Sequence, residues 1–283
     1  MFDTYIINLE NEINNYNKLK TQLENKHYKN IFRFDAIYGK KITNFKPYDK
    51  YLIPLFKYCA PFGVLGSGLS HYFILETAYK QYLNNKNKNK YVLVLEDDVI
   101  PIHDSDYIEK IISKLDNSID VLILYTFKVL DKSKKSSKRE IIIREPFTFG
   151  LPACAYIVNI KSIPKIIDTK LWYYYDSIHF NNPFKTNFTV AYYHKNLFET
   201  SDEESHNRST SANNYLLFKI IDYICSLFGF DNYLFFTLFK VFRIPYINFE
   251  ITLFDIIYAF TLFVLILTIY IIYKKRIQMK VSK

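Results

Sequence analysis

The stretch YVLVLEDD, Tyr91–Asp98, decides the fold class. Its first five residues form an unbroken apolar run, which is typical of a strand buried on both faces of a sheet. Similar short runs occur at Thr4–Leu9, Ile31–Ile37 and Val121–Tyr125. Apolar residues at helical spacing lie between these runs, and the longest such segment ends at Leu83. This alternation predicts an α/β domain with a mainly parallel sheet and helices on both faces.

Three acids, Glu96, Asp97 and Asp98, follow the central strand directly, at the end where open α/β sheets bind their ligands. Neighbouring carboxylates beside an apolar strand repel one another unless a cation lies among them. If the chain stays extended, Glu96 and Asp98 point to one side and Asp97 to the other. Glu96 and Asp98 could then hold Mg²⁺ or Mn²⁺ and neutralise a nucleotide diphosphate. The alternative is a solvated acidic turn in which Asp98 or Asp104 caps a helix.

A second motif, FGVLGSGLSH, spans Phe62–His71. Its three glycines allow a tight backbone path. Ser67 or Ser70 could cap the helix that follows, which would expose backbone N–H groups to an anion. Glycine-rich turns before helices are common, so this motif alone does not define a site.

The composition excludes several classes of protein. Among 283 residues, 49% are hydrophobic and 23% charged, and there are only 6 Gly and 9 Pro, which excludes disordered and collagen-like chains. Three scattered cysteines exclude a disulfide framework or a zinc knuckle. The net charge of +9 would suit an anionic partner, but many lysines gather in Lys86–Lys90 and Lys132–Arg139. Because no basic helix carries interleaved aromatic residues, we do not expect nucleic acid as a partner.

The C-terminal region is more apolar than the rest of the chain. Eighteen residues without a charge, Ile256–Tyr273, would extend about 27 Å as a helix, close to the roughly 30 Å hydrocarbon core of a bilayer. The sequence therefore predicts a single-pass membrane protein with a transmembrane helix at 250–274 and a basic tail at 275–283. Residues 215–249 predict amphipathic helices close to the membrane.

The remaining residues predict a globular domain at 1–200 and a polar linker at 201–214. Two signals conflict on the side of the membrane on which this domain lies, and we give slightly more weight to the one that favours the cytosol. An N-terminal region without an apolar signal segment favours the cytosol, whereas the excess of Lys and Arg after the predicted span favours the opposite side.

Five segments, taken in the order in which they occur along the chain, resemble the motifs of glycosyltransferase family 25. This family includes lipopolysaccharide glycosyltransferases and collagen galactosyltransferases. The resemblance covers about residues 3–205, and VLVLEDDV is its most specific match. It rests on five segments: INLE (Ile7–Glu10), FRFDAIYGK (Phe32–Lys40), GSGLSH (Gly66–His71), VLVLEDDV (Val92–Val99) and GLPACAYIVNIKSIPKII (Gly150–Ile167).

The resemblance implies a glycosyltransferase-A-like (Rossmann-like) catalytic domain. It implies transfer, with inversion, of a hexose (galactose or glucose) from a UDP-sugar to a hydroxyl of a glycan, lipid-linked or protein acceptor. Glu96 and Asp98 would bind Mn²⁺ or Mg²⁺, and Asp176 would be the catalytic base. The residues implied in donor binding are Asn8, Gly66, Ser70, His71 and Asp97, of which Asp97 would face the ribose or the sugar.

Departures from the family pattern support an alternative, a catalytically inactive glycosyltransferase-like membrane protein with a structural or interaction role. The family places arginines just after the opening strand, where this chain has acids and amides at Glu10–Asn15. The segment around Asp176 reads DSIH, with one acid instead of two. The family's late Ser-Asp pair has a weak match at Ser201-Asp202, and His179 and His194 are further candidates for metal or phosphate contacts.

Overall fold

The computed structural model describes residues 2–60, 62–84, 89–126, 140–145, 151–172, 175–180, 187–200, 240–244 and 249–281. The chain divides into two compact units, Met1–Glu203 and Glu204–Lys283, and each is described by itself.

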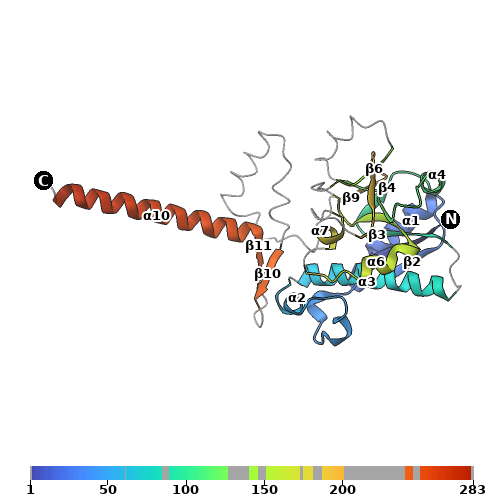
Figure 1. Cartoon of the computed structure of the whole chain (residues 1–283), viewed down its shortest axis with the longest axis horizontal. Helices are drawn as coiled ribbons and strands as arrows, with labels where there is room; N and C mark the ends of the chain where they lie inside the picture. The colour runs from blue at the N-terminus through green and yellow to red at the C-terminus, as the bar shows by residue number, and fades with distance from the viewer. Residues whose placement is uncertain are drawn as a thin grey trace. The chain divides into compact units, whose positions relative to one another are not determined.

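A seven-stranded sheet forms the centre of the first unit (Figure 1). Its strand order is β2-β1-β3-β7-β5-β8-β6. β1 pairs in parallel with β2 and β3, and β5 pairs in parallel with β8. β7 and β6 run antiparallel to their neighbours. The expected α/β domain is therefore confirmed, and its sheet is mixed, because β6 and β7 run opposite to the other five strands. The strands are β1 (Phe2–Asn8), β2 (Ile31–Asp35), β3 (Tyr91–Glu96), β5 (Val121–Ile123), β6 (Ile141–Ile143), β7 (Ala155–Asn159) and β8 (Val190–Tyr193).

Helices cover both faces of this sheet, because successive side chains of each strand point to opposite faces. Val92 and Val94 of β3 pack in one core cluster with α3, α6 and α7, and α3 runs along the lower side of this unit in Figure 1. Leu93 and Leu95 pack in a second cluster with α1 and α4. The helices are α1 (Ile13–Asn25), α2 (Pro54–Cys59), α3 (Phe62–Leu83), α4 (Ser105–Ser113), α6 (Ile163–Ile167) and α7 (Tyr175–His179).

The glycine-rich motif lies inside α3, so the expectation of a turn that precedes a helix capped by Ser67 or Ser70 is wrong. A Cβ atom on Gly66 would lie 2.4 Å from the carbonyl oxygen of Ile37, and one on Gly39 would lie 1.9 Å from that of Phe62. The start of α3 thus packs directly on the backbone that follows β2. This close packing requires glycine and outweighs the low helix propensity of that residue.

The second unit contains an antiparallel hairpin followed by a long helix. β10 (Lys240–Ile244) pairs with β11 (Phe249–Thr252), and α10 spans Leu253–Val281. The predicted helices at 215–249 are therefore wrong for 240–244, a segment with the β-branched residues Val241 and Ile244 that ends before Pro245. The remaining described position of that range, Phe249, also belongs to a strand. The expected linker at 201–214 and the rest of the range up to 239 lie outside the described residues.

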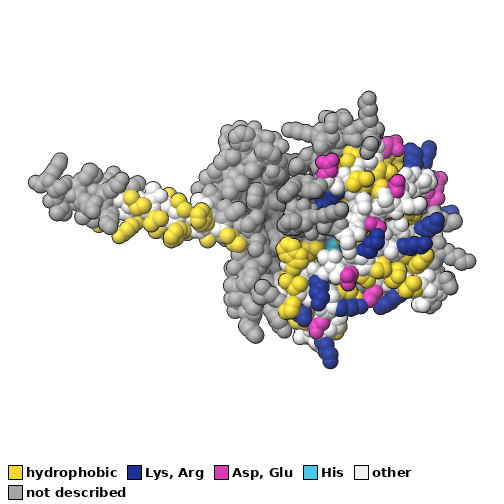
Figure 2. Space-filling view, in the orientation of Figure 1, with side chains coloured by type: hydrophobic (Ala, Val, Ile, Leu, Met, Phe, Trp, Pro, Cys, Tyr) yellow, Lys and Arg dark blue, Asp and Glu magenta, His cyan; other side chains and the backbone are white. Residues whose placement is uncertain are grey.

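The described side chains of α10 are mainly hydrophobic, and many are exposed within this unit (Figure 2). α10 begins at Leu253, inside the predicted span at 250–274, and continues into the predicted basic tail, whereas residues 250–252 belong to β11. Within the part of the chain that the structure describes, no helix has the length and hydropathy needed to cross a membrane. The expected transmembrane helix is therefore not confirmed.

Candidate active site at the carboxyl edge of the sheet

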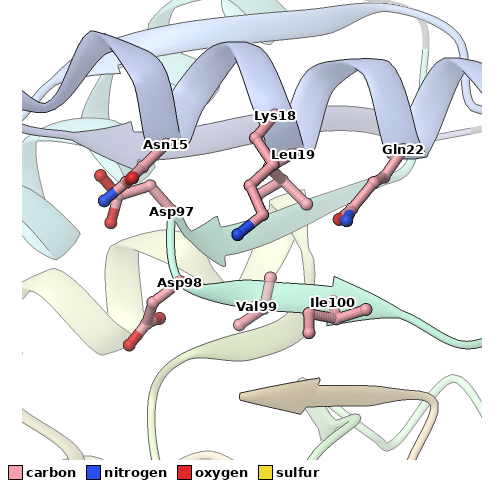
Figure 3. A pocket seen from close by; sticks show the side chains of 8 residues that line it. All are labelled: Asn15, Lys18, Leu19, Gln22, Asp97, Asp98, Val99 and Ile100. Atoms are coloured by element: carbon pink, nitrogen blue, oxygen red, sulfur yellow. The ribbon is translucent and has the colours of Figure 1, made fainter. Parts of the chain in front are cut away.

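The acidic cluster forms the turn between β3 and β4 (Val99–Pro101), and β4 pairs antiparallel with β9 (Phe198–Thr200). The extended chain ends at Glu96, so the expected alternation of the three acids is wrong. Asp97 and Asp98 both line a shallow hollow beside α1, whereas Glu96 contacts a residue of α3. Figure 3 shows Lys18 and Gln22 pointing from α1 toward this turn and β4. The hollow is lined by Asn15, Lys18, Leu19, Gln22, Asp97, Asp98, Val99 and Ile100.

Asp97 is held by Asn8, the last residue of β1. The Asn8 side-chain amide donates to Asp97 Oδ2 at 2.5 Å and to the carbonyl oxygen of Glu12 at 2.8 Å. Burial raises the pKa of the Asp97 carboxyl, the bond from Asn8 lowers it, and the charge of Glu96 raises it further. The structure thus brings together two of the residues expected to bind the donor, Asn8 and Asp97.

Arg33 is a site residue that the sequence did not single out. It lies on β2, and its Nε donates to Asn8 Oδ1 at 2.8 Å. One terminal nitrogen forms an ion pair with Asp35 at 2.9 Å, and the guanidinium lies 5.8 Å from the centre of the Tyr16 ring. β1 and β2 were both predicted, but Arg33 is the middle residue of β2 and lies in register with Ile6, so the rule for strand ends did not point to its contact with Asn8.

His71 connects the acidic cluster to the buried interior. Its Nε2 lies 3.4 Å from Glu96 Oε1, and its Nδ1 lies 2.9 Å from the hydroxyl oxygen of Tyr156. The imidazole stacks on the Tyr175 ring at 4.5 Å between centroids, and His71 is 1% exposed. His71 is therefore placed to orient the Glu96 carboxylate from behind, on the α3 face.

Ser70 and Gly66 make contacts within the protein. The Ser70 hydroxyl donates to the carbonyl oxygen of Gly66 at 2.7 Å and accepts from the backbone N–H of Ile37 at 2.8 Å. Both residues are buried. These contacts join α3 to the segment after β2, which is a packing role.

Asp176 lies in α7, and its side chain is outside the described residues. The ring of the preceding residue, Tyr175, stacks on His71, which places α7 beside the acidic cluster. His179 of α7 is fully buried and bonds through Nε2 to the Tyr72 hydroxyl at 2.7 Å. Burial lowers the pKa of His179 to about 3, so it is a neutral core residue.

The other late candidates lie elsewhere or are not described. His194 follows β8, and its Nδ1 lies 3.1 Å from the carbonyl oxygen of Glu140, beside the β6–β8 pair. That pair is at the opposite edge of the sheet from β2. The Ser201-Asp202 pair lies outside the described residues.

The donor set at the turn suits a hard divalent cation, because all three side chains are carboxylates. Among the residues that the structure describes, no three His, Cys, Asp or Glu side chains converge on a point that could hold a metal ion. Mg²⁺-type ions are commonly bound by one or two carboxylates together with substrate phosphates. The residues therefore fit a cation shared between the protein and a diphosphate.

Fold and site together define an α/β enzyme with an acidic site at the carboxyl edge of its central strand. A model of glycosyltransferase family 25 (LPS biosynthesis protein) matches residues 1–168, and the chain belongs to this family. It is therefore a glycosyltransferase, as the motifs led us to expect. No curated protein sequence matches the chain.

Three solved structures show distant likeness. A glycosyltransferase involved in glycosylation of the major capsid of PBCV-1 is 10% identical, with a TM-score of 0.41 over 72% of this chain and 95% of that chain. The galactosyltransferase LgtC, solved with donor and acceptor sugar analogs, is 10% identical, with a TM-score of 0.39 over 80% and 96%. The glycosyltransferase GlyE of Streptococcus pneumoniae TIGR4 is 11% identical, with a TM-score of 0.33 over 82% and 50%.

Proposed function

We propose that the chain transfers a hexose from a UDP-sugar to a hydroxyl group of a glycan, lipid-linked or protein acceptor, with inversion and with the help of a divalent cation. The observation that carries this proposal is the acidic turn Glu96–Asp98 at the carboxyl end of the central strand of a family 25 chain. Three consecutive carboxylates at this edge suit the binding of a diphosphate through a cation.

The three acids are given two roles. Glu96 and Asp98 are the proposed ligands of Mn²⁺ or Mg²⁺, and Asp97 is the carboxylate that faces the ribose or the sugar. Asp97 is assigned to the donor because Asn8 already fixes one of its oxygens. When bound, the cation supplies positive charge that stabilises the departing diphosphate. His71 keeps the Glu96 carboxylate in place from the α3 face.

An inverting displacement also needs a base that accepts the proton of the acceptor hydroxyl. We assign this role to Asp176. The support is the position of α7. Its first residue, Tyr175, stacks on His71, and Nε2 of His71 lies 3.4 Å from Glu96 Oε1. Asp176→Asn is expected to abolish transfer while leaving the binding of UDP unchanged within about threefold, since a base acts on the acceptor.

The proposal is tested with a panel of nucleotide sugars incubated with the purified full chain, with either MnCl₂ or EDTA. Release of UDP from UDP-galactose or UDP-glucose only in the presence of the metal supports it. An inactive scaffold instead gives no release from any donor and no metal-dependent binding of UDP by calorimetry. Metal-independent release at the same rate would contradict the role of the acidic turn.

A further inference from the structure

Asn8 is buried to 1% exposure, and its side-chain amide uses all of its polar atoms within the protein. Both amide hydrogens are donated, one to Asp97 Oδ2 at 2.5 Å and one to the carbonyl oxygen of Glu12 at 2.8 Å. Its Oδ1 accepts from Arg33 Nε at 2.8 Å. Each end of the amide therefore has its own partners, and the oxygen end depends on Arg33.

All three partners of Asn8 select the same orientation. Asp97 and the Glu12 carbonyl oxygen are acceptors and require the NH₂ group, and the guanidinium of Arg33, which carries only donors, requires the amide oxygen. Arg33 is the partner that holds the oxygen end of this buried side chain, which would otherwise lack a hydrogen bond. The reverse orientation would put an amide oxygen against Asp97 and an NH₂ group against a cation. We infer that Arg33 is a positioning residue for glycosyl transfer, which acts through Asn8 to fix the Asp97 carboxylate. This inference rests on the proposed donor-binding role of Asp97.

The surroundings of Arg33 hold the guanidinium in one place. Its other contacts are the ion pair with Asp35, a long bond of 3.5 Å to the carbonyl oxygen of Leu9 and the ring of Tyr16. The side chain of Asp35 is 77% exposed and that of Arg33 only 25%. Arg33 is thus anchored on several sides at the end of β1. Because the guanidinium already bonds to groups of the protein, its effect on the nucleotide-sugar donor is indirect.

Three substitutions separate positioning from a direct charge effect. In Gln, the side-chain nitrogen is the same number of bonds from Cα as Nε of Arg, so Arg33→Gln keeps the donor to Asn8 and removes the charge. Arg33→Met keeps much of the length and removes both. Arg33→Lys keeps the charge and loses the donor at the Nε position. Asp35→Asn is the matched control, because it removes the exposed ion pair without touching Asn8.

Calorimetry with UDP and Mn²⁺ on the full chain gives the first readout. Arg33→Met and Arg33→Lys are expected to weaken UDP binding by about 10- to 100-fold, the range for hydrogen bonds to charged groups. Arg33→Gln is expected to recover binding to within about threefold, and Asp35→Asn to stay within about twofold. The Mn²⁺ concentration for half-maximal binding should not change, because Glu96 and Asp98 are not displaced. Equal losses in Gln and Met, or a parallel loss of Mn²⁺ affinity, would overturn the inference.

A double variant tests the path through Asp97. If Arg33 acts only through this carboxylate, Arg33→Met added to Asp97→Asn weakens UDP binding no further. A direct contact between Arg33 and the donor would instead give losses that multiply, and the inference would be wrong.

A crystal structure of Arg33→Met gives a readout that does not depend on the donor. We expect the Asn8 side chain, whose buried oxygen has lost its partner, to shift and the Asp97 carboxylate to move away from its position in the wild type. An unmoved carboxylate overturns the inference. A displaced carboxylate in a protein whose wild type does not bind UDP supports the positioning by Arg33 and refutes the proposed function, so the two failures are distinguished.

Discussion

His179 should make the first unit sensitive to acid, and replacing it should remove that sensitivity. Burial lowers the pKa of His179 to about 3, and the charge of nearby His71 contributes. In the unfolded chain this pKa returns to about 6.5. Between these values the unfolded state binds a proton that the folded state does not, so the free energy of unfolding falls as the pH falls below 6.5. At about 1.4 kcal/mol per pH unit, the loss from pH 8 to pH 5 is about 2 kcal/mol.

The variant His179→Gln isolates this contribution. Tyr72 donates its hydroxyl hydrogen to the carbonyl oxygen of Thr169, so it accepts from His179 Nε2, and the amide of Gln supplies the same donor without titrating. Urea unfolding of both proteins at pH 8 and pH 5, followed by circular dichroism, gives the measurement. We expect the wild type to lose about 2 kcal/mol more than the variant on acidification. An equal loss in the two proteins would refute the reasoning.

Three further predictions concern the supports of the site and the packing of the fold. Gly66→Ala should destabilise the fold by about 1–3 kcal/mol and lower the melting temperature, because the new Cβ meets backbone atoms. Gly68→Ala is the control and should cost less, because its Cβ meets only the Leu171 side chain. A larger loss in Gly68→Ala than in Gly66→Ala would contradict this packing. His71→Ala should raise the Mn²⁺ concentration for half-maximal UDP binding about tenfold, measured by calorimetry, and an unchanged value would exclude its role behind Glu96. Asp120→Ala should lower the free energy of unfolding in urea at pH 7 by about 3 kcal/mol. The reason is that the buried carboxylate accepts hydrogen bonds from Ser162, Lys165 and the Thr189 backbone. A loss below about 1 kcal/mol would show that this network is dispensable.

Much of the sheet could be predicted because its strands carry their signal locally. Tyr91–Leu95 is apolar throughout, and the structure buries its central residues between two helical layers. The antiparallel insertion of β7 between β3 and β5 could not be derived from such a run, since burial on both faces looks the same in either direction. The strand at Lys240–Ile244 was missed because the apolar composition of the region was given more weight than its β-branched residues and Pro245.

The sequence predicted which acids form the candidate site, but it did not predict the directions of their side chains. The position of Glu96–Asp98 at the end of β3 follows from the sequence, whereas the turn at Asp97 that redirects the side chains does not. Arg33 escaped notice because its contact with Asn8 joins two strands far apart in the chain. The arginines expected just after the first strand are absent from that segment, and the structure brings a guanidinium to the same strand end from β2. Long-range contacts of this kind are visible only once the strands are paired.

The most direct test of the account is calorimetric titration of UDP into the full chain with Mn²⁺ present, for the wild type and for Asp98→Asn. The substitution keeps the size of the side chain and removes one proposed metal ligand. The account predicts metal-dependent binding in the wild type and at least a 100-fold loss in the variant, without a fall in melting temperature. Unchanged binding of UDP in Asp98→Asn would contradict the claim that the acidic turn holds the cation.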